Sequence, residues 1–215
     1  MSKTFIIGTC RVYTPSWYLS ELGIPFRNIY HYPGEMVHSP RQILQSIDIM
    51  KGKKVIDKSD FSNVFRTEKP LERLDQLKVD LSSFDKFIVE ISAVNDYYTD
   101  KFICHFTGEE LTVPFKIREY TLEELMNCIS KIHAEFDNKP ILFVHYYNHN
   151  HLNIKRYMLS YALDSYCLKV KNATHLDLLK FIAEHGLEKT MYDQWHHTDF
   201  MIDIVKQEMA KFIKG

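Results

Sequence analysis

Short apolar runs separated by helical patterns are the feature that most constrains the fold of this chain. Five runs read as buried strands, at residues 4–7, 28–32, 86–92, 140–146 and 166–170. Most of them lack the apolar–polar alternation of a strand with one face in water. Continuous apolar runs of this length are typical of strands in a parallel sheet that is covered on both faces.

Helical patterns fill the intervals between these runs, at residues 39–52, 121–132, 151–164, 175–185 and 198–213. Ser39-Pro40 is a helix start, and Thr121 with Glu124 forms a capping box. Strands that alternate with helices are joined by right-handed crossovers. We therefore predict a three-layer α/β/α fold with a five-stranded parallel sheet in the flavodoxin-like order.

One segment interrupts this alternation. Residues 102–106 and 111–117 read as two strands joined by a glycine-containing turn, which predicts a β-hairpin insertion over residues 102–118. The polar segment 55–81 is expected to form a loop and a short helix. No internal repeat interrupts the pattern, so residues 1–215 are expected to form a single domain.

Composition excludes some classes of partner. Lysine and arginine number 27 against 28 aspartates and glutamates, a formal net charge of −1, so neither nucleic acid nor a membrane is expected. The four cysteines are widely spaced, which argues against a structural zinc site or a disulfide framework. The first apolar run is too short for a signal peptide or a membrane span. We expect a cytoplasmic protein with reduced thiols, and the pattern predicts no particular oligomeric state.

Polar side chains lie where open parallel sheets bind their ligands, just beyond the carboxyl ends of the strands. Cys10 follows the first predicted strand, Asn95 follows the third, and His145 lies near the end of the fourth. Asp193 and His196 come just before the last predicted helix. A thiol, an amide, two imidazoles and a carboxylate are therefore expected at one edge of the sheet.

Three of these residues could form a nucleophilic triad. Gly8 permits a tight turn before Cys10, and a helix that starts at this turn would lower the pKa of the thiol. Asp193 could accept the imidazole N–H of His196, whose other nitrogen would act as general base. His197 is the alternative base, although Asp193 has the better spacing to His196. The competing interpretation of Cys10 is an inert buried cysteine. The competing interpretation of Asp193 and His196 is a polar cap of the last helix.

The order of these motifs resembles the SGNH (GDSL-type) hydrolase superfamily. Gly8-Thr9-Cys10 is similar to the family's Gly-Asp-Ser block after the first strand. Ala93-Val94-Asn95-Asp96 is similar to its Gly-x-Asn-Asp block, and Asp193-Gln194-Trp195-His196 matches its late Asp-x-x-His block. The resemblance spans nearly the whole chain, and it implies a catalytic triad of Cys10, His196 and Asp193.

This chain departs from the family pattern at the nucleophile. Cys10 stands in place of the usual serine, as in the GSCFA branch and related capsular polysaccharide-biosynthesis proteins that the chain resembles. The resemblance implies an oxyanion hole made by the N–H of Cys10, a loop N–H near Gly34 and the amide of Asn95. Gly34 is preferred to Gly52 as the glycine of the second block. Ser92 or Glu90 would line the site if Asn95 lies elsewhere.

Two other residues are candidate substrate contacts. Arg11 could bind a phosphate or carboxylate of the substrate, or form an ion pair at the surface. His145 could line the pocket. His145, His149 and His151 also have a spacing open to metal binding, but no cysteine or carboxylate lies beside them in sequence, so we expect no metal ion.

The expected function is acyl transfer, as an esterase or O-acyltransferase with a Cys-His-Asp triad. The substrate would be a small-molecule or glycan ester. No cofactor is required, and an acyl-coenzyme A is a suitable donor because it is already a thioester. The alternative is a non-catalytic binding module of the same fold for a carbohydrate, a nucleotide or a protein partner.

Overall fold

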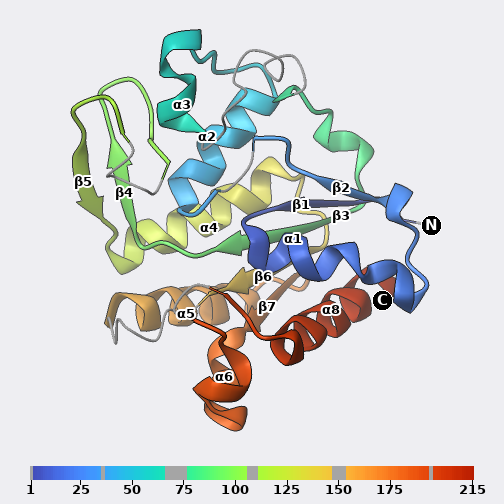
Figure 1. Cartoon of the computed structure of the whole chain (residues 1–215). Helices are drawn as coiled ribbons and strands as arrows, with labels where there is room; N and C mark the ends of the chain where they lie inside the picture. The colour runs from blue at the N-terminus through green and yellow to red at the C-terminus, as the bar shows by residue number, and fades with distance from the viewer. Residues whose placement is uncertain (1, 35–36, 66–76, 106–110, 147–153, 194–195) are drawn as a thin grey trace.

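A parallel sheet forms the centre of the molecule (Figure 1). The computed structural model describes residues 2–34, 37–65, 77–105, 111–146, 154–193 and 196–215. The sheet has five strands in the order β2-β1-β3-β6-β7, all parallel, which confirms the predicted flavodoxin-like order. The strands are β1 (Thr4–Ile7), β2 (Ile29–His31), β3 (Lys86–Ile91), β6 (Ile141–His145) and β7 (Ala173–Asp177).

Helices cover both faces of this sheet and so complete the predicted three layers (Figure 1). Successive strand residues point to opposite faces. Phe5 and Ile7 therefore enter one core, whereas Ile6 enters the other. The first core is covered by α2 (Pro40–Met50), α3 (Phe61–Val64), α4 (Leu122–Glu135) and α5 (Ile154–Cys167). The second is covered by α1 (Cys10–Trp17), α6 (Leu178–His185) and α8 (Asp199–Lys214), and the short α7 (Leu187–Thr190) precedes α8.

The helix-start signals in the sequence are confirmed. Ser39 caps α2 by accepting the Gln42 N–H, with Pro40 in the first turn. Thr121 and Glu124 form the reciprocal capping box at the start of α4. These side chains satisfy backbone N–H groups that have no partner within the helix, and so they fix where each helix begins.

The fifth predicted strand is wrong. Residues 166–170 form the end of α5 and the turn after it, and the edge strand is β7. Thr174 is exposed and His175 half-buried in the middle of β7, so this strand lacks the continuous apolar run that marks the central strands. The helix predicted over residues 175–185 begins only at Leu178, because Asp177 ends the strand and caps α6 through the Leu179 N–H.

An antiparallel pair lies beside the sheet, as the hairpin prediction required, but its first strand comes earlier in the chain. β4 (Asn95–Tyr98) pairs with β5 (Lys116–Glu119). Residues 106–110 of the predicted turn lie outside the described residues. In segment 55–81 the described part includes a 3-10 turn, Lys58–Asp60, and α3, in agreement with a loop and short helix.

Asp96 attaches this pair to the helical layer. Its buried carboxylate accepts hydrogen bonds from the Ser39 hydroxyl, from the Tyr120 hydroxyl at 2.7 Å and from Arg41 Nη1 at 3.1 Å. Arg41 also pairs with Glu124 at 2.6 Å. Asn-Asp is a common turn sequence. Here burial of the aspartate among these donors favours an extended strand instead.

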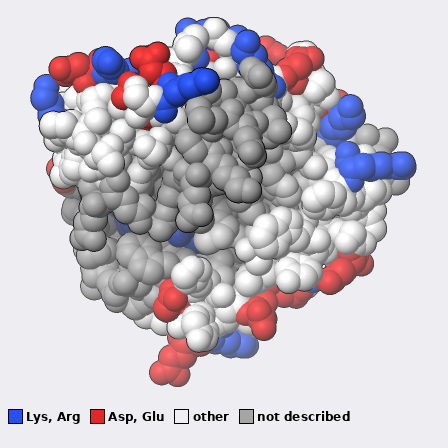
Figure 2. All heavy atoms as spheres, turned by 45° about the horizontal axis from the view of Figure 1, so that its top comes forward, with Lys and Arg blue, Asp and Glu red and all other residues white. Residues whose placement is uncertain are grey.

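The surface mixes charges of both signs. Figure 2 shows acidic and basic side chains next to one another along the rim of the face it presents. Within the described ranges, no helix combines the length and the apolar character needed to cross a bilayer.

We expect Asp96→Asn to lower the free energy of unfolding by about 3 kcal/mol, because it removes the buried charge that pairs with Arg41 and turns an amide towards hydroxyl donors. Asp100→Asn is the matched control, two residues after the end of β4. Asp100 is 89% exposed and pairs with Lys116 at 3.3 Å, so its loss should cost less than about 0.5 kcal/mol. Urea unfolding measures the free energy of unfolding of both variants. Equal losses of stability would contradict the role of Asp96 as the attachment of this strand pair.

Candidate functional site

The segments that follow β1, β2 and β3 lie together at the carboxyl edge of the sheet. Val37, after β2, donates its N–H to the Gly8 carbonyl at 3.0 Å. Ser92 and Ala93, after β3, both donate to the His38 carbonyl, at 2.9 and 3.0 Å. The fold therefore assembles these segments at the edge where the sequence predicts the site.

Cys10 is the first residue of α1, directly after the Gly8-Thr9 turn, and its side chain is partly buried. Burial raises the pKa of its thiol above the ordinary 9.0, Glu90 adds to this effect, and the Arg11 charge and a Thr9 hydrogen bond oppose it. The expected lowering of this pKa by the helix start is wrong, because desolvation outweighs it. Cys10 is thus a thiol at neutral pH and needs a base to become a nucleophile.

Glu90 organises the turn that carries Cys10. This fully buried carboxylate accepts hydrogen bonds from the Thr9 N–H at 2.8 Å and from the Thr9 hydroxyl at 2.6 Å, and it pairs with Arg11 Nε at 2.7 Å. A β-carbon on Gly8 would lie 2.6 Å from Glu90 Cβ and 2.8 Å from Val12. Glycine is therefore required at position 8 for the turn to approach β3.

Arg11 is buried, so the surface ion pair considered from the sequence is wrong. Its guanidinium carbon lies 3.5 Å from the ring centroid of Tyr146, the residue after β6, in a cation–π contact. Arg156 donates to the Tyr146 carbonyl at 3.1 Å. The buried partners Glu90 and Tyr146 already hold Arg11 on two sides, and contact with a substrate stays a prediction.

Asp193 and His196 form a tight pair before α8. The backbone N–H of His196 donates to Asp193 Oδ1 at 2.8 Å, and its ring Nδ1 lies 2.7 Å from Asp193 Oδ2. A carboxylate only accepts hydrogen bonds, so Nδ1 carries the proton when the ring is neutral and Nε2 is left basic. The side chain of His196 is 59% exposed and so can reach an incoming substrate.

His197 anchors this loop. An antiparallel bridge joins it to Met191, and its buried ring lies 5.9 Å from the ring of Tyr146. Burial lowers the pKa of His197 to about 3, helped by the charges of Arg11 and His196. Among the described residues neither ring nitrogen of His197 has a hydrogen-bond partner. A ring with so low a pKa is a weak base, which favours His196 over its neighbour.

Tyr146 connects the two halves of the candidate triad. Burial raises its pKa to about 12; Arg11 and Arg156 oppose this rise, whereas Glu90 and Asp193 add to it. The loop that carries Asp193 and the helix start that carries Cys10 therefore lie around the same tyrosine, on the face covered by α1 and α8. The contact between the Cys10 thiol and the imidazole of His196 stays a prediction.

The other predicted site residues are placed as follows. Asn95 is the half-buried first residue of β4, where it pairs with Glu119. Three residues separate it from the end of β3. Gly34 is buried, and a β-carbon there would lie 2.4 Å from the Tyr32 ring. His145 is fully buried at the end of β6. Their proposed substrate contacts stay predictions, and residues 149 and 151 lie outside the described residues.

We expect acid to destabilise the fold partly through His197. Its pKa is about 3 when folded and 6.5 unfolded, so between these values the unfolded chain binds the extra proton. Stability should therefore fall as the pH drops from about 6.5 to about 3, by about 1.4 kcal/mol per pH unit for this group. His197→Gln should reduce the slope measured by urea unfolding at pH 4 to 7. Equal slopes in the wild type and in His197→Gln would refute the assignment.

Comparison with known proteins supports the fold. The family model "TviD N-terminal domain" matches residues 2–108. A lipase/acylhydrolase from Enterococcus faecalis is similar in structure, with 11% identity, a TM-score of 0.59 and coverage of 100% of this chain and 96% of that one.

Two larger esterases are similar at lower TM-scores. A two-domain esterase active on acetylated mannans gives 0.46 at 11% identity, covering 99% of this chain and 48% of that one. An acetyl xylan esterase (Est2A) from Butyrivibrio proteoclasticus gives 0.48 at 8% identity, covering 99% and 63%. Comparison with curated protein sequences gives no match. The fold expected from the sequence is thus confirmed: this chain shares its α/β/α architecture with the lipase/acylhydrolase from Enterococcus faecalis.

Proposed function

We propose that this protein is a cysteine-dependent enzyme of acyl transfer, with Cys10 as nucleophile, His196 as general base and Asp193 as its orienting partner. The observation that carries the proposal is the Asp193–His196 pair, held by two hydrogen bonds of 2.8 and 2.7 Å. A solvated helix cap has no need of an imidazole held in one tautomer. The similarity in fold to a lipase/acylhydrolase supports ester chemistry.

The proposed reaction begins with proton transfer. His196 Nε2 takes the proton from the Cys10 thiol, and the sulfur attacks the acyl carbonyl carbon, whose π electrons move to its oxygen. The oxyanion then re-forms the carbonyl and expels the alkoxide or thiolate, which receives the proton from the imidazolium. Water or an acceptor hydroxyl next gives its proton to His196, attacks the thioester and releases the acyl product. The Cys10 thiolate regains the proton.

The high pKa of the thiol explains why a base is needed. Cys10 is buried enough that its thiolate is disfavoured, so the proton must move to His196 as the sulfur attacks. The backbone N–H groups at the start of α1 are the first source of oxyanion stabilisation. We further propose that the amide of Asn95 and the loop near Gly34 complete this hole.

The cysteine nucleophile indicates which kind of acyl donor the enzyme would use. A thioester intermediate forms without loss of bond energy from a donor that is itself a thioester, which favours an acyl-coenzyme A over an oxygen ester. From the resemblance to capsular polysaccharide-biosynthesis proteins, we propose a glycan hydroxyl as acceptor. We also keep the expectation of a cytoplasmic location, where acyl-coenzyme A is available and thiols remain reduced.

The rival function is a binding module of the same fold. The raised pKa of Cys10 favours it, because an unreactive thiol suits a buried packing residue. The two functions predict different reactivity for this sulfur.

We expect Cys10→Ala to lower the rate of acetyl release from acetyl-coenzyme A or p-nitrophenyl acetate by about 10³-fold or more, since no covalent intermediate can form. His196→Gln should cost about 10²- to 10⁴-fold, and Asp193→Asn should also cost activity by leaving the tautomer unfixed. His185→Gln, on α6, is the control and should retain the rate. A Cys10→Ala enzyme as active as the wild type would end the proposal.

We also expect iodoacetamide at pH 8 to label Cys10 faster than the other thiols. Burial raises the pKa of Cys104 to about 11 and that of Cys167 to about 12, so these thiols should react slowly. His196→Gln should slow labelling of Cys10 alone, as followed by peptide mass spectrometry. Labelling of Cys10 that is as slow as that of Cys104, or that is insensitive to His196, would favour the binding module.

A further inference from the structure

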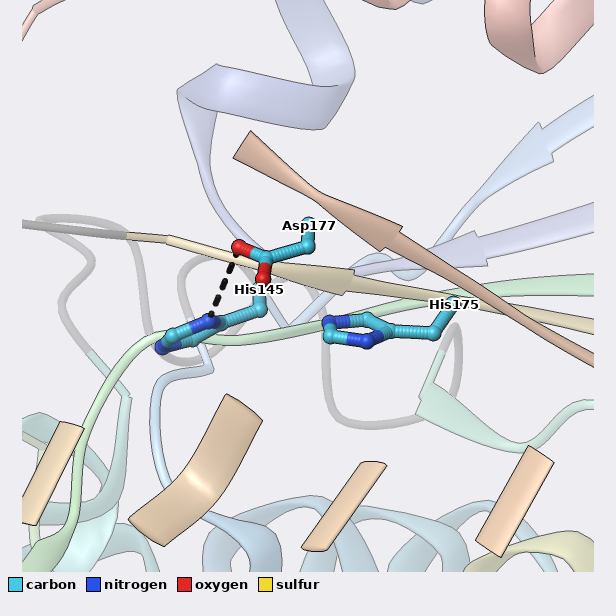
Figure 3. Close-up of side chains that lie close together, drawn as sticks. All are labelled: His145, His175 and Asp177. Atoms are coloured by element: carbon cyan, nitrogen blue, oxygen red, sulfur yellow. Dashed lines mark ion pairs between the residues drawn. The ribbon is translucent and has the colours of Figure 1, made fainter. Parts of the chain in front are cut away.

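A second group of chemically active side chains lies at the carboxyl ends of β6 and β7. It consists of His145, His175 and Asp177 (Figure 3). His145 is directly opposite Asp177 in the β6–β7 pairing, and His175 precedes Asp177 by two residues, so the alternation of the strands turns all three to one face. This is the face covered by α5, opposite to the one on which Tyr146 meets Arg11.

The two imidazoles have ring nitrogens that lack hydrogen-bond partners. Among the described residues, neither nitrogen of the fully buried His145 is bonded, and Nε2 of His175 is also unpaired. His145 Nδ1 lies 3.7 Å from Asp177 Oδ1, which is too long for a hydrogen bond. Unpaired buried polar atoms are costly, and several in one place indicate a missing partner.

Neighbouring side chains hold His175 and Asp177 in the orientation that metal ligands need. His175 Nδ1 lies 2.8 Å from Asp164 Oδ1, and because a carboxylate only accepts, this nitrogen carries the proton and Nε2 keeps a free lone pair. Asp177 is held by the Ser160 hydroxyl at 2.7 Å and the Leu179 N–H at 2.9 Å. A carboxylate–histidine pair and a hydrogen-bonded carboxylate are the usual outer partners of metal ligands.

We propose that His145, His175 and Asp177 bind one divalent transition-metal ion of the Zn²⁺ type. Their ligand atoms already lie within 4.8 Å of one another. Ligands at zinc-bond lengths lie roughly 3.3 Å apart, so small side-chain rotations would close the site. Two imidazoles and one carboxylate are ligands that suit zinc, iron and cobalt, and three protein ligands leave a coordination position open.

The bound ion would have a structural effect that is separate from the proposed ester chemistry. It would join β6 to β7 at the edge of the sheet, and through Asp164 and Ser160 it would tie both strands to α5. The fold would therefore gain stability in proportion to the occupancy of the site.

The test uses Co²⁺ as a spectroscopic probe and Zn²⁺ as the competing ion on the full chain, freed of metal with a chelator that is then removed. We expect one equivalent of Co²⁺ to bind with visible ligand-field bands, Zn²⁺ to displace it, and one equivalent of Zn²⁺ to raise the melting temperature. His145→Gln and His175→Gln should each weaken Co²⁺ binding by at least about 100-fold. His185→Gln, a histidine outside the cluster, should leave it unchanged.

Two further measurements decide the outcome if a ligand variant fails to fold. Asp164→Asn retains all three ligands and should weaken Co²⁺ binding by about 10- to 100-fold, because His175 loses its orienting partner. X-ray absorption of the zinc-loaded wild type should show nitrogen and oxygen ligands that include two imidazoles. Absence of stoichiometric uptake, sulfur in the coordination shell, or affinity equal in wild type and Asp164→Asn would each overturn the proposal.

Discussion

The buried carboxylate of Glu90 is the interaction on which the rest of the carboxyl edge depends. It lies on a central strand, and it binds the backbone and hydroxyl of Thr9 and the guanidinium of Arg11. These contacts hold the turn after β1 against β3 and place Cys10 at the start of α1. A buried charge is tolerated only where hydrogen-bond donors surround it. The buried Glu90 therefore requires the Thr9 turn and Arg11 on α1 to stay in place beside it.

Arg11 connects Glu90 on β3 to the residue that follows β6. Its other contact is the ring of Tyr146 after β6, and the same ring lies near the anchoring residue His197. One chain of packed and charged groups therefore connects the first turn of the protein to the loop before its last helix. This arrangement explains how residues nearly 190 positions apart come to share one face of the fold.

Local signals predicted those parts of the fold that depend on local chemistry. Strands β1, β2, β3 and β6 were visible as apolar runs, and the starts of α2 and α4 were visible as caps, because each is decided within a few residues. Strand β7 was not, since exposed Thr174 and half-buried His175 interrupt its apolar residues and its polar residues read as a helix start. That error also hid His175 and Asp177: their His-x-Asp spacing puts both side chains on one face only in a strand.

Motif order predicts a candidate triad, but it does not predict the electrostatics around Cys10. The sequence cannot show that Glu90 lies beside the thiol or that burial outweighs the helix start, because both depend on packing between strands that are far apart in the chain. For the same reason the ion pair considered for Arg11 at the surface proved to be a buried one with Glu90.

The partial burial of Cys10 has a consequence for its chemical lifetime. Oxidants convert thiolates to sulfenic acid far faster than they convert thiols. A sulfur kept protonated at rest, and ionised only when a substrate and a base meet it, spends little time in the vulnerable form. The same packing that makes Cys10 slow to ionise would thus allow it to persist through oxidative stress that inactivates enzymes with a standing thiolate.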